Sequence, residues 1–306
     1  MILTQLPDLP PRPETAANAA FRQAFYARWG RENAIVCGRA ARAEYSAFTQ
    51  SLSIKMARGG AERYLLPQRE LRVDDDSLLI LNQGRRYGSR LEPGPHPAES
   101  FAVFFRPGLL AQVRAARQQT PAALLDRPLA EAPEVFAFNE HLRPQCTRLG
   151  RQLARLRTEV LAGERSEDWL EQHLLLLAGA MLDDEADAEQ SFSRLAAARA
   201  STRRELARRL QRAADLIETR YDEPLTLDDL AAAACLSRYH FVRFFAQLHG
   251  LPPYAALCAK RARVARRLLA AGECDREAVA QRCGFGTRWA LQRALQRFAQ
   301  DPHTGH

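Results

Sequence analysis

Residues 226–248 read TLDDLAAAACLSRYHFVRFFAQL, and residues 275–298 read DREAVAQRCGFGTRWALQRALQRF. Each stretch opens with a residue that can cap a helix, Thr226 or Asp275, and continues through a short helix, a tight turn and a longer helix. In the first stretch the large apolar side chains of the longer helix recur at the spacing of one helix face. These residues are Phe241, Phe244, Phe245 and Leu248. Each stretch therefore predicts a helix-turn-helix.

The two stretches are copies of one another. The offset between them is 49 residues before the turn, from Ala231 to Ala280, and 50 after it, from Arg243 to Arg293. The second turn is therefore one residue longer than the first. A helix from about 253 to 269 is expected to join the copies.

The outward face of each longer helix carries arginine, aromatic and amide side chains. The candidate DNA-contacting residues are Arg238, Tyr239, Val242, Arg243 and Gln247 in the first copy, and Arg288, Trp289, Gln292, Arg293 and Gln296 in the second. Two such helices on one face of B-DNA lie about 34 Å apart, and a joining helix of about 17 residues spans about 25 Å. One chain is thus expected to read two successive major grooves, with Arg243 and Arg293 forked onto guanine.

The charge of the chain gathers beside these motifs. The formal net charge is +8 and the sequence pI is about 9.5. Residues 201–306 hold 18 Lys and Arg against 11 Asp and Glu, whereas residues 1–200 hold 26 against 25. An excess of positive charge confined to one domain is typical of a protein that binds a polyanion such as DNA.

At these residues the chain resembles the AraC/XylS family of bacterial transcriptional regulators. The resemblance covers about 204–302 and is strongest in 225–248 and in the second turn, at Gly284-Phe285. The family residues in the first of these pieces are Ser237, Phe241, Arg243 and Phe245. The resemblance implies a sequence-specific activator that binds double-stranded promoter DNA, with RNA polymerase as a partner, and it implies no enzyme activity.

The second copy departs from the family pattern at Trp289, Ala290 and Leu295. We expect the short closing helix usual in the family to be missing or truncated after Pro302. We therefore expect the second copy to be held less firmly than the first and to contribute affinity more than specificity.

The N-terminal half predicts an antiparallel sheet, which makes the whole chain α+β. Between Ser51 and Phe105 apolar residues alternate with polar ones, or form short apolar runs, in five or six segments. Strands at this spacing are typical of a small barrel or sandwich. With the segment 100–110, this half is similar to the cupin-type sensor domain of many family members, which implies control by an effector or partner.

The side chains inside the barrel are candidates to line a pocket for such an effector, although plain core is the commoner role for each of them. The candidate lining residues are Ile54, Met56, Tyr64, Leu79, Leu81, Phe101 and Phe105.

Two amphipathic helices follow, at 149–160 and 170–181, and their apolar stripes predict the seam of a homodimer. The acidic stretch 183–193 is expected to be a linker. We therefore expect four parts along the chain: a flexible Pro-rich N-terminus at 1–20, a cupin-like sensor at 21–140, a helical dimerisation segment and linker at 141–200, and the tandem DNA-binding domain at 201–306.

Other classes of protein lack support in the sequence. The N-terminus has no signal-peptide pattern and the longest apolar run is nine residues, which predicts a cytoplasmic protein without a membrane partner. No catalytic motif is found, and residues 21–140 contain a single histidine, His96, so neither a metal site nor a cofactor is expected. Two alternatives stay open: a cupin-type enzyme with a DNA-targeting domain, and a family-like protein that acts through protein partners without reading DNA.

Overall fold

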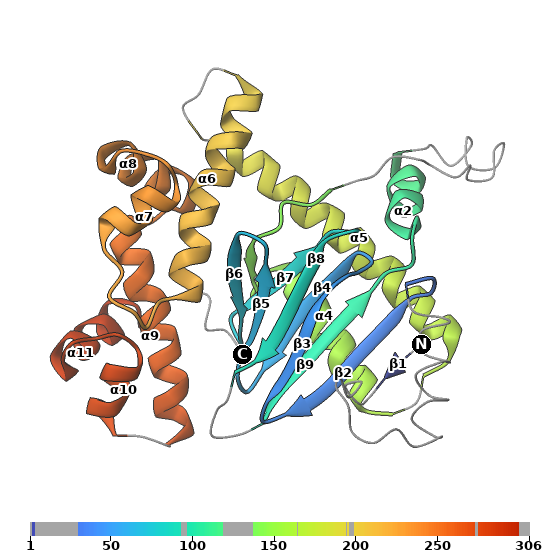
Figure 1. Cartoon of the computed structure of the whole chain (residues 1–306), viewed down its shortest axis with the longest axis horizontal. Helices are drawn as coiled ribbons and strands as arrows, with labels where there is room; N and C mark the ends of the chain where they lie inside the picture. Colours follow the sequence, from blue (N-terminus) through green and yellow to red (C-terminus); the bar gives the residue numbers. More distant parts are fainter. Residues whose placement is uncertain are drawn as a thin grey trace. The chain divides into compact units, whose positions relative to one another are not determined.

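The computed structural model describes residues 2–3, 30–92, 97–118, 137–163, 165–193, 195, 199–272 and 275–299. The chain divides into two compact units, Met1–Ala186 and Asp187–His306, which we call unit 1 and unit 2. Unit 1 holds the strands together with helices α2, α4 and most of α5, and unit 2 is helical (Figure 1). The α+β class expected from the sequence is confirmed.

Unit 1 contains two sheets that face one another. The six-stranded sheet runs in the order β1 (Ile2–Leu3), β2 (Ala34–Ala40), β9 (Ala98–Phe104), β4 (Ser53–Arg58), β7 (Ser77–Leu81) and β10 (Leu142–Pro144). The four-stranded sheet runs in the order β3 (Ala43–Thr49), β8 (Arg86–Leu91), β5 (Glu62–Leu66) and β6 (Arg69–Val73). Neighbouring strands are antiparallel except β1 and β2.

The six-stranded sheet is buried on both faces. In β4, Ile54 lies opposite Ile80 and Val103, and these side chains pack toward the helices. The opposite face of the sheet carries Ala57, Leu79 and their neighbours, and these side chains pack against the four-stranded sheet. Because successive strand residues point to opposite faces, the sheet separates two apolar cores.

The helices of unit 1 are α2 (Leu109–Gln118), α4 (Arg148–Leu161) and α5 (Glu167–Phe192). Thr147 caps α4 by accepting a hydrogen bond from the Gly150 amide at 3.1 Å. The apolar stripes of α4 and α5 are the ones that the sequence indicated. The buried residues in them are Leu149, Leu153, Leu156, Val160, Leu170, Leu174, Leu177 and Met181.

The prediction that these stripes form a dimer seam is wrong, because they are already buried against the six-stranded sheet. Burying a leucine stabilises a fold by roughly 1.5–3 kcal/mol, so exposing eight large side chains for a partner would dismantle the core. Three other leucines on these helices remain exposed: Leu161 at 47%, Leu175 at 40% and Leu176 at 56%.

The acidic stretch 183–193 is helical through Phe192, and the boundary between the two units, after Ala186, falls within it, so the predicted linker is part of a helix and not a break in one. Arg143 of β10, whose side chain is 2% exposed, forms ion pairs with Asp184 and Glu185. Arg117 of α2 likewise contacts Asp183. Because these partners compensate the acidic side chains, α5 continues where composition alone suggested a break.

Unit 2 consists of α6 (Ala200–Thr219), α7 (Leu227–Ala233), α8 (Arg238–His249), α9 (Pro253–Ala271), α10 (Arg276–Arg282) and α11 (Arg288–Arg297). All six helices contribute to one apolar core. The joining helix predicted at about 253–269 is α9. It ends at Gly272, whose φ of +70° is the left-handed conformation that closes many helices.

Candidate nucleic-acid interface

The first helix-turn-helix consists of α7, residues 234–237 and α8. A complete capping box starts α7: the Thr226 hydroxyl accepts from the Asp229 amide at 3.1 Å, and the Asp229 carboxylate accepts from the Thr226 amide at 2.9 Å. Ser237 occupies the cap position of α8, but its hydroxyl contacts the ring of His240 at 2.9 Å instead of a backbone amide. The Ser237 side chain therefore provides no capping hydrogen bond at the start of α8.

The second helix-turn-helix consists of α10, residues 283–287 and α11. Asp275 caps α10 through the Ala278 amide at 2.7 Å, and Thr287 caps α11 through the Ala290 amide at 3.2 Å. Five residues separate these helices, whereas four separate α7 and α8. This difference is the one-residue insertion that the sequence offsets indicated.

Inward side chains fix both longer helices on the core of unit 2. Phe241 and Phe245 are buried and contact edge to face, with ring centroids 5.3 Å apart. In α11 the buried residues are the smaller Leu291 and Ala294. Arg266 of α9 donates to the Phe298 carbonyl oxygen at the end of α11. Because α11 has both this contact and a side-chain cap, the predicted inequality between the two copies stays a prediction.

The outward residues of the two helices lie in equivalent places. Arg243 and Arg293 are exposed, as are the aromatic side chains of Tyr239, at 70%, and Trp289, at 67%. The exposed fractions show that neither ring covers a neighbouring helix. Two arginines and two aromatic rings are thus available at matched positions for a partner.

The remaining candidate residues differ in exposure. Arg238 and Arg288 are exposed, and Arg238 forms a two-pronged ion pair with Asp228 of α7. The hydrogen bond from Arg238 holds the pKa of Asp228 below its ordinary value. Gln292 accepts from Arg276 at 2.8 Å and is half-buried, whereas Gln296 is exposed.

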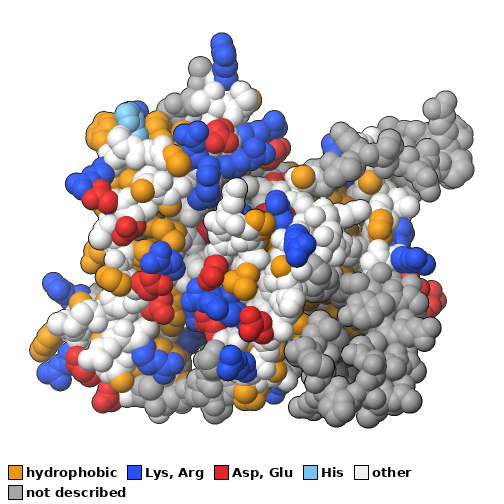
Figure 2. Space-filling model, viewed as in Figure 1, with side chains coloured by type: hydrophobic (Ala, Val, Ile, Leu, Met, Phe, Trp, Pro, Cys, Tyr) orange, Lys and Arg blue, Asp and Glu red, His pale blue; other side chains and the backbone are white. Residues whose placement is uncertain are grey.

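Two candidates lie only partly on the outer face. Val242 is half-buried against the core of unit 2, and the side-chain oxygen of Gln247 is buried without a hydrogen-bond partner among the described residues. The helical periodicity of α8 predicts that both side chains point outward, but periodicity within one helix does not show how far the neighbouring helices extend around it. On the face drawn in Figure 2, Lys and Arg side chains are interspersed with Asp and Glu over these helices.

The structure does not bring the seven predicted effector-lining residues together. Ile54, Met56, Phe101 and Phe105 belong to the core between the six-stranded sheet and the helices. Tyr64, Leu79 and Leu81 belong to the core between the two sheets. A single pocket lined by all seven is excluded, because the six-stranded sheet lies between the two groups.

The space between the sheets contains polar groups that sequence reasoning missed. Lys55 is 2% exposed, and its ammonium group lies 3.6 Å from the ring centroid of Phe104 and 5.3 Å from that of Tyr87. Burial lowers the pKa of Lys55 to about 7. Ser53 and Tyr87 are neighbours, yet neither hydroxyl makes a hydrogen bond of normal geometry within the described residues. Alternation along β4 does not reveal this cluster, because the pattern cannot show that a second sheet covers the face that carries Ser53 and Lys55.

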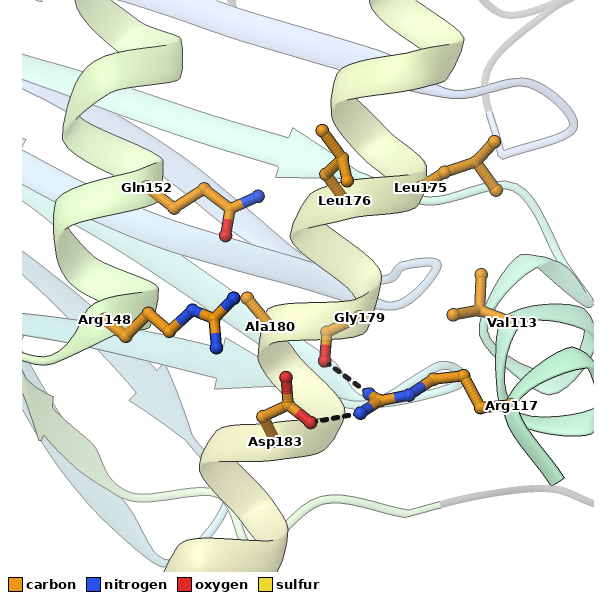
Figure 3. A pocket seen from close by; sticks show the side chains of 9 residues that line it. All are labelled: Val113, Arg117, Arg148, Gln152, Leu175, Leu176, Gly179, Ala180 and Asp183. Atoms are coloured by element: carbon orange, nitrogen blue, oxygen red, sulfur yellow. Dashed lines mark hydrogen bonds and ion pairs between the residues drawn. The ribbon is translucent and has the colours of Figure 1, made fainter.

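A shallow groove of about 290 Å³ lies between α2, α4 and α5 (Figure 3). The apolar side chains of Leu175, Leu176 and Val113 line it. On one side Arg117 donates to the Gly179 carbonyl oxygen at 3.0 Å and contacts Asp183. This groove could not be predicted, since α2 was not recognised in the sequence.

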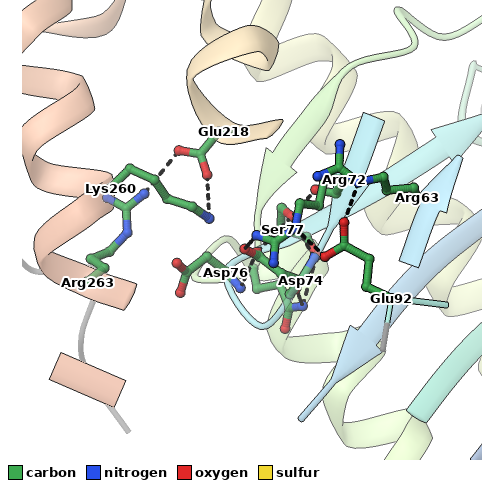
Figure 4. A network of polar contacts seen from close by, with 10 residues as sticks. Arg63, Arg72, Asp74, Asp76, Ser77, Glu92, Glu218, Lys260 and Arg263 are labelled. Atoms are coloured by element: carbon green, nitrogen blue, oxygen red, sulfur yellow. Dashed lines mark hydrogen bonds and ion pairs between the residues drawn. The ribbon is translucent and has the colours of Figure 1, made fainter. Parts of the chain in front are cut away.

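A second polar network lies at the edge of the four-stranded sheet (Figure 4). Burial alone would raise the pKa of Glu92, but the guanidinium groups of Arg72 and Arg63 lower it below its ordinary value. The Arg72 Nε lies 2.8 Å from this carboxylate. The network joins β5 and β6, which carry Arg63 and Arg72, to the end of β8.

Within the described ranges no three His, Cys, Asp or Glu side chains are placed to hold a metal ion. His96 and Cys274 lie outside those ranges. No helix of the described chain is both long and apolar enough to cross a membrane.

Comparisons with known proteins agree with the motif geometry. Residues 230–302 match the model of a helix-turn-helix domain. The DNA-binding domain of AdpA, a global transcriptional factor solved with a target DNA, is 34% identical, covering 30% of this chain and 79% of its own, with a TM-score of 0.26. The C-terminal domain of AraT, a response regulator from Geobacillus stearothermophilus, is 25% identical over 29% of this chain and 77% of its own, with a TM-score of 0.27.

Over the whole chain, ToxT from Vibrio cholerae is 11% identical and covers 87% of this chain and 94% of its own, with a TM-score of 0.35. No curated protein matches the chain at a significant level. The tandem motifs and the matched residues define a DNA-binding transcription regulator of the helix-turn-helix class. Within that class the chain belongs to the AraC/XylS family, which confirms the resemblance seen in the sequence.

Proposed function

We propose that the chain regulates transcription by reading a specific, asymmetric sequence of double-stranded promoter DNA, with α8 and α11 in successive major grooves. The observation that carries the proposal is the matched exposure of Arg243 with Arg293 and of Tyr239 with Trp289 on two copies of one scaffold. Arginine can donate two hydrogen bonds to the O6 and N7 atoms of guanine. The exposed rings are suited to contact thymine methyl groups or sugars.

The experiment is selection of bound sequences from random DNA by the full chain, followed by affinity measurements over a salt series. Binding is expected to be sequence-specific and to weaken steeply with salt, because phosphate contacts release counterions. Arg243→Ala is expected to relax the base preference at one position. The matched control is Arg155→Ala in unit 1, which also removes an exposed arginine and should leave the preference unchanged.

The two alternatives predict other outcomes. A protein that acts through protein partners alone would enrich no sequence, and its weak DNA binding would not respond to Arg243→Ala. An enzyme that is merely targeted to DNA would still select a sequence, so activity assays and metal analysis of the purified chain separate it from a regulator.

We propose further that an effector or partner controls the regulator through unit 1. The support is the polar cluster between the sheets, where Lys55, Ser53 and Tyr87 are buried with few partners. Buried polar groups are normally hydrogen-bonded, so a small molecule with polar atoms would satisfy them. Thermal unfolding of the full chain against a panel of metabolites tests this, with the Lys55→Met variant as control.

The proposed regulator works in the cytoplasm as a homodimer that activates RNA polymerase. The exposed Leu175 and Leu176 of α5 support a dimer, because they are apolar and not used by the core of unit 1. Sedimentation of the full chain at tens of micromolar tests this part of the proposal.

A further inference from the structure

The joining helix α9 carries a cluster of cationic side chains, and most of them are not exposed to solvent. Lys260 has no exposed side-chain surface, Arg263 is 15% exposed, and Arg261 is 8% exposed. Buried cations are expensive unless they are paired, so each is expected to have a structural or functional role. None of the three can reach DNA as a phosphate or base contact without leaving its site.

Two of these cations attach α9 to α6. The Lys260 ammonium lies 2.8 Å from the Glu218 carboxylate, and Arg263 lies 3.1 Å from the other oxygen of the same group (Figure 4). Lys260 also lies 5.4 Å from the ring centroid of Tyr221. These contacts hold the middle of α9 against the end of α6.

Arg261 makes a different set of contacts. Its Nε donates to the Tyr221 carbonyl oxygen at 2.6 Å, and its Nη2 donates to the Glu223 carbonyl oxygen at 2.7 Å. Both acceptors lie in the loop between α6 and α7, directly before the Thr226 capping box. The fork of Arg261 therefore fixes the backbone that leads into the first helix-turn-helix.

The other side of the same guanidinium group meets the second helix-turn-helix. Its Cζ lies 5.9 Å from the ring centroid of Phe285, and a Cβ atom added to Gly284 would lie 2.9 Å from that Cζ and 2.9 Å from the Asp222 carbonyl oxygen. The turn between α10 and α11 thus lies directly against Arg261 and the α6–α7 loop. One side chain touches the entry to the first motif and the turn of the second.

The two turns of the repeat differ in the residue at the left-handed position, and the contact with Arg261 explains the difference. Gly284 has a φ of +72°, and its counterpart in the first turn, Cys235, has a φ of +51°. Both conformations favour glycine, yet the first turn contains an exposed cysteine. Only at the second turn would a Cβ atom meet an arginine and a backbone carbonyl, so a side chain fits in the first turn and not in the second.

We propose that Arg261 is a positioning residue that sets the angle and distance between α8 and α11, and thereby the spacing of the two base-pair groups that one chain can read. The inference rests on the proposed reading of two grooves. A lysine could not replace this arginine, because a single ammonium group lacks the planar fork that reaches two carbonyl oxygens and stacks on a ring.

The test uses the full chain and DNA obtained by selection with the wild-type protein. Binding is measured to the selected site, to the site with two base pairs inserted between its halves, and to a DNA that keeps only the first half. Two base pairs shift the second half by about 7 Å and rotate it by about 70°. Wild-type affinity is expected to drop by about tenfold or more on insertion, because one reader loses its bases.

Arg261→Gln and Arg261→Lys are expected to reduce that drop to less than about threefold, while binding to the first half alone stays unchanged. Gly284→Ala should have the same effect because it displaces Arg261, whereas Cys235→Ala should not. The matched control is Arg263→Gln, which removes a charge from the same helix together with its ion pair to Glu218 of α6.

A residue with only a stabilising role would lower binding to all three DNAs equally and leave the ratio between spacings unchanged. That result with folded Arg261→Lys, or a wild-type chain that tolerates the insertion, overturns the inference. Failure of the wild-type chain to select any DNA would instead refute the proposed function. If Arg261→Gln does not fold, the Arg261→Lys and Gly284→Ala ratios decide.

Discussion

Gly150, in the first turn of α4, gives a sharp test of the packing in unit 1. Replacing a helical glycine by alanine normally stabilises a helix by roughly 0.5–1 kcal/mol, because glycine loses more backbone entropy on folding. At Gly150 the added Cβ atom would lie 2.1 Å from the Gln145 carbonyl oxygen and 2.6 Å from its carbon. We therefore expect Gly150→Ala to lower the free energy of unfolding instead of raising it.

The size of the effect follows from what holds Gln145. Its amide donates to the Asp76 carbonyl oxygen at 2.8 Å, and its side-chain amide donates to the Asp74 and Ser77 carbonyl oxygens at 3.0 and 2.9 Å. Overpacking costs about 1–3 kcal/mol, and each weakened hydrogen bond costs about 1 kcal/mol. After subtraction of the helix-propensity gain, Gly150→Ala should destabilise unit 1 by roughly 2–4 kcal/mol.

The matched control is Gly179→Ala in α5, where no atom lies within 4 Å of an added Cβ and the normal gain of about 0.5–1 kcal/mol is expected. Urea unfolding measures both variants in a Trp289→Phe background, which removes the tryptophan of unit 2 and keeps Trp169 of α5 as a fluorescent probe of unit 1. If Gly150→Ala proves as stable as Gly179→Ala, the placement of α4 on the segment around Gln145 is refuted.

Four further predictions concern function and pH. Arg243→Ala should cost roughly 1–3 kcal/mol against the preferred base, and Arg293→Ala should cost less specificity; equal losses in selection experiments would contradict the unequal roles of the two copies. Burial lowers the pKa of His249 to about 4, so the unfolded chain takes up this proton first as pH falls from 6.5 to 4. Stability of unit 2 should fall in that window, and His249→Gln should remove that slope in denaturation curves. The same argument applies to Lys55, because burial lowers its pKa to about 7 and the unfolded chain again takes up the proton first. Lys55 should therefore lower the stability of unit 1 increasingly as pH falls from 10.5 to 7. Lys55→Met should raise the unfolding midpoint at pH 7 but not at pH 10.5. Leu176→Glu should convert the proposed dimer to a monomer in sedimentation, and an unchanged mass would exclude α5 as the interface.

Sequence reasoning worked best where the chain repeats itself. The offset of 49 and then 50 residues is enough to locate both turns and the one-residue insertion in the second. A single copy would have left the direction of each helix face uncertain, but Arg243 and Arg293 support one another. The local periodicity also located the apolar stripes of α4 and α5 correctly.

The errors arose where the answer depends on which partner an apolar surface meets. The stripe of α4 was assigned to a second subunit, because nothing in a helical period names the sheet that covers it. The pocket residues were grouped because all are apolar strand residues, but alternation along β4 and β7 sends them to two cores. In the same way, the ion pairs of Arg143 that extend α5 join residues 41 and 42 positions apart, and no local pattern reveals them.

Because β4 is buried on both faces, a residue of β4 that moves on one face changes the packing on the other face as well. Lys55 follows Ile54 and precedes Met56, so a displacement at the polar cluster shifts two side chains in the layer that carries α4 and α5. Close-packed interiors transmit strain because they contain little free volume. A ligand bound between the sheets would therefore displace side chains that contact α4 and α5, and the sheet would not have to open.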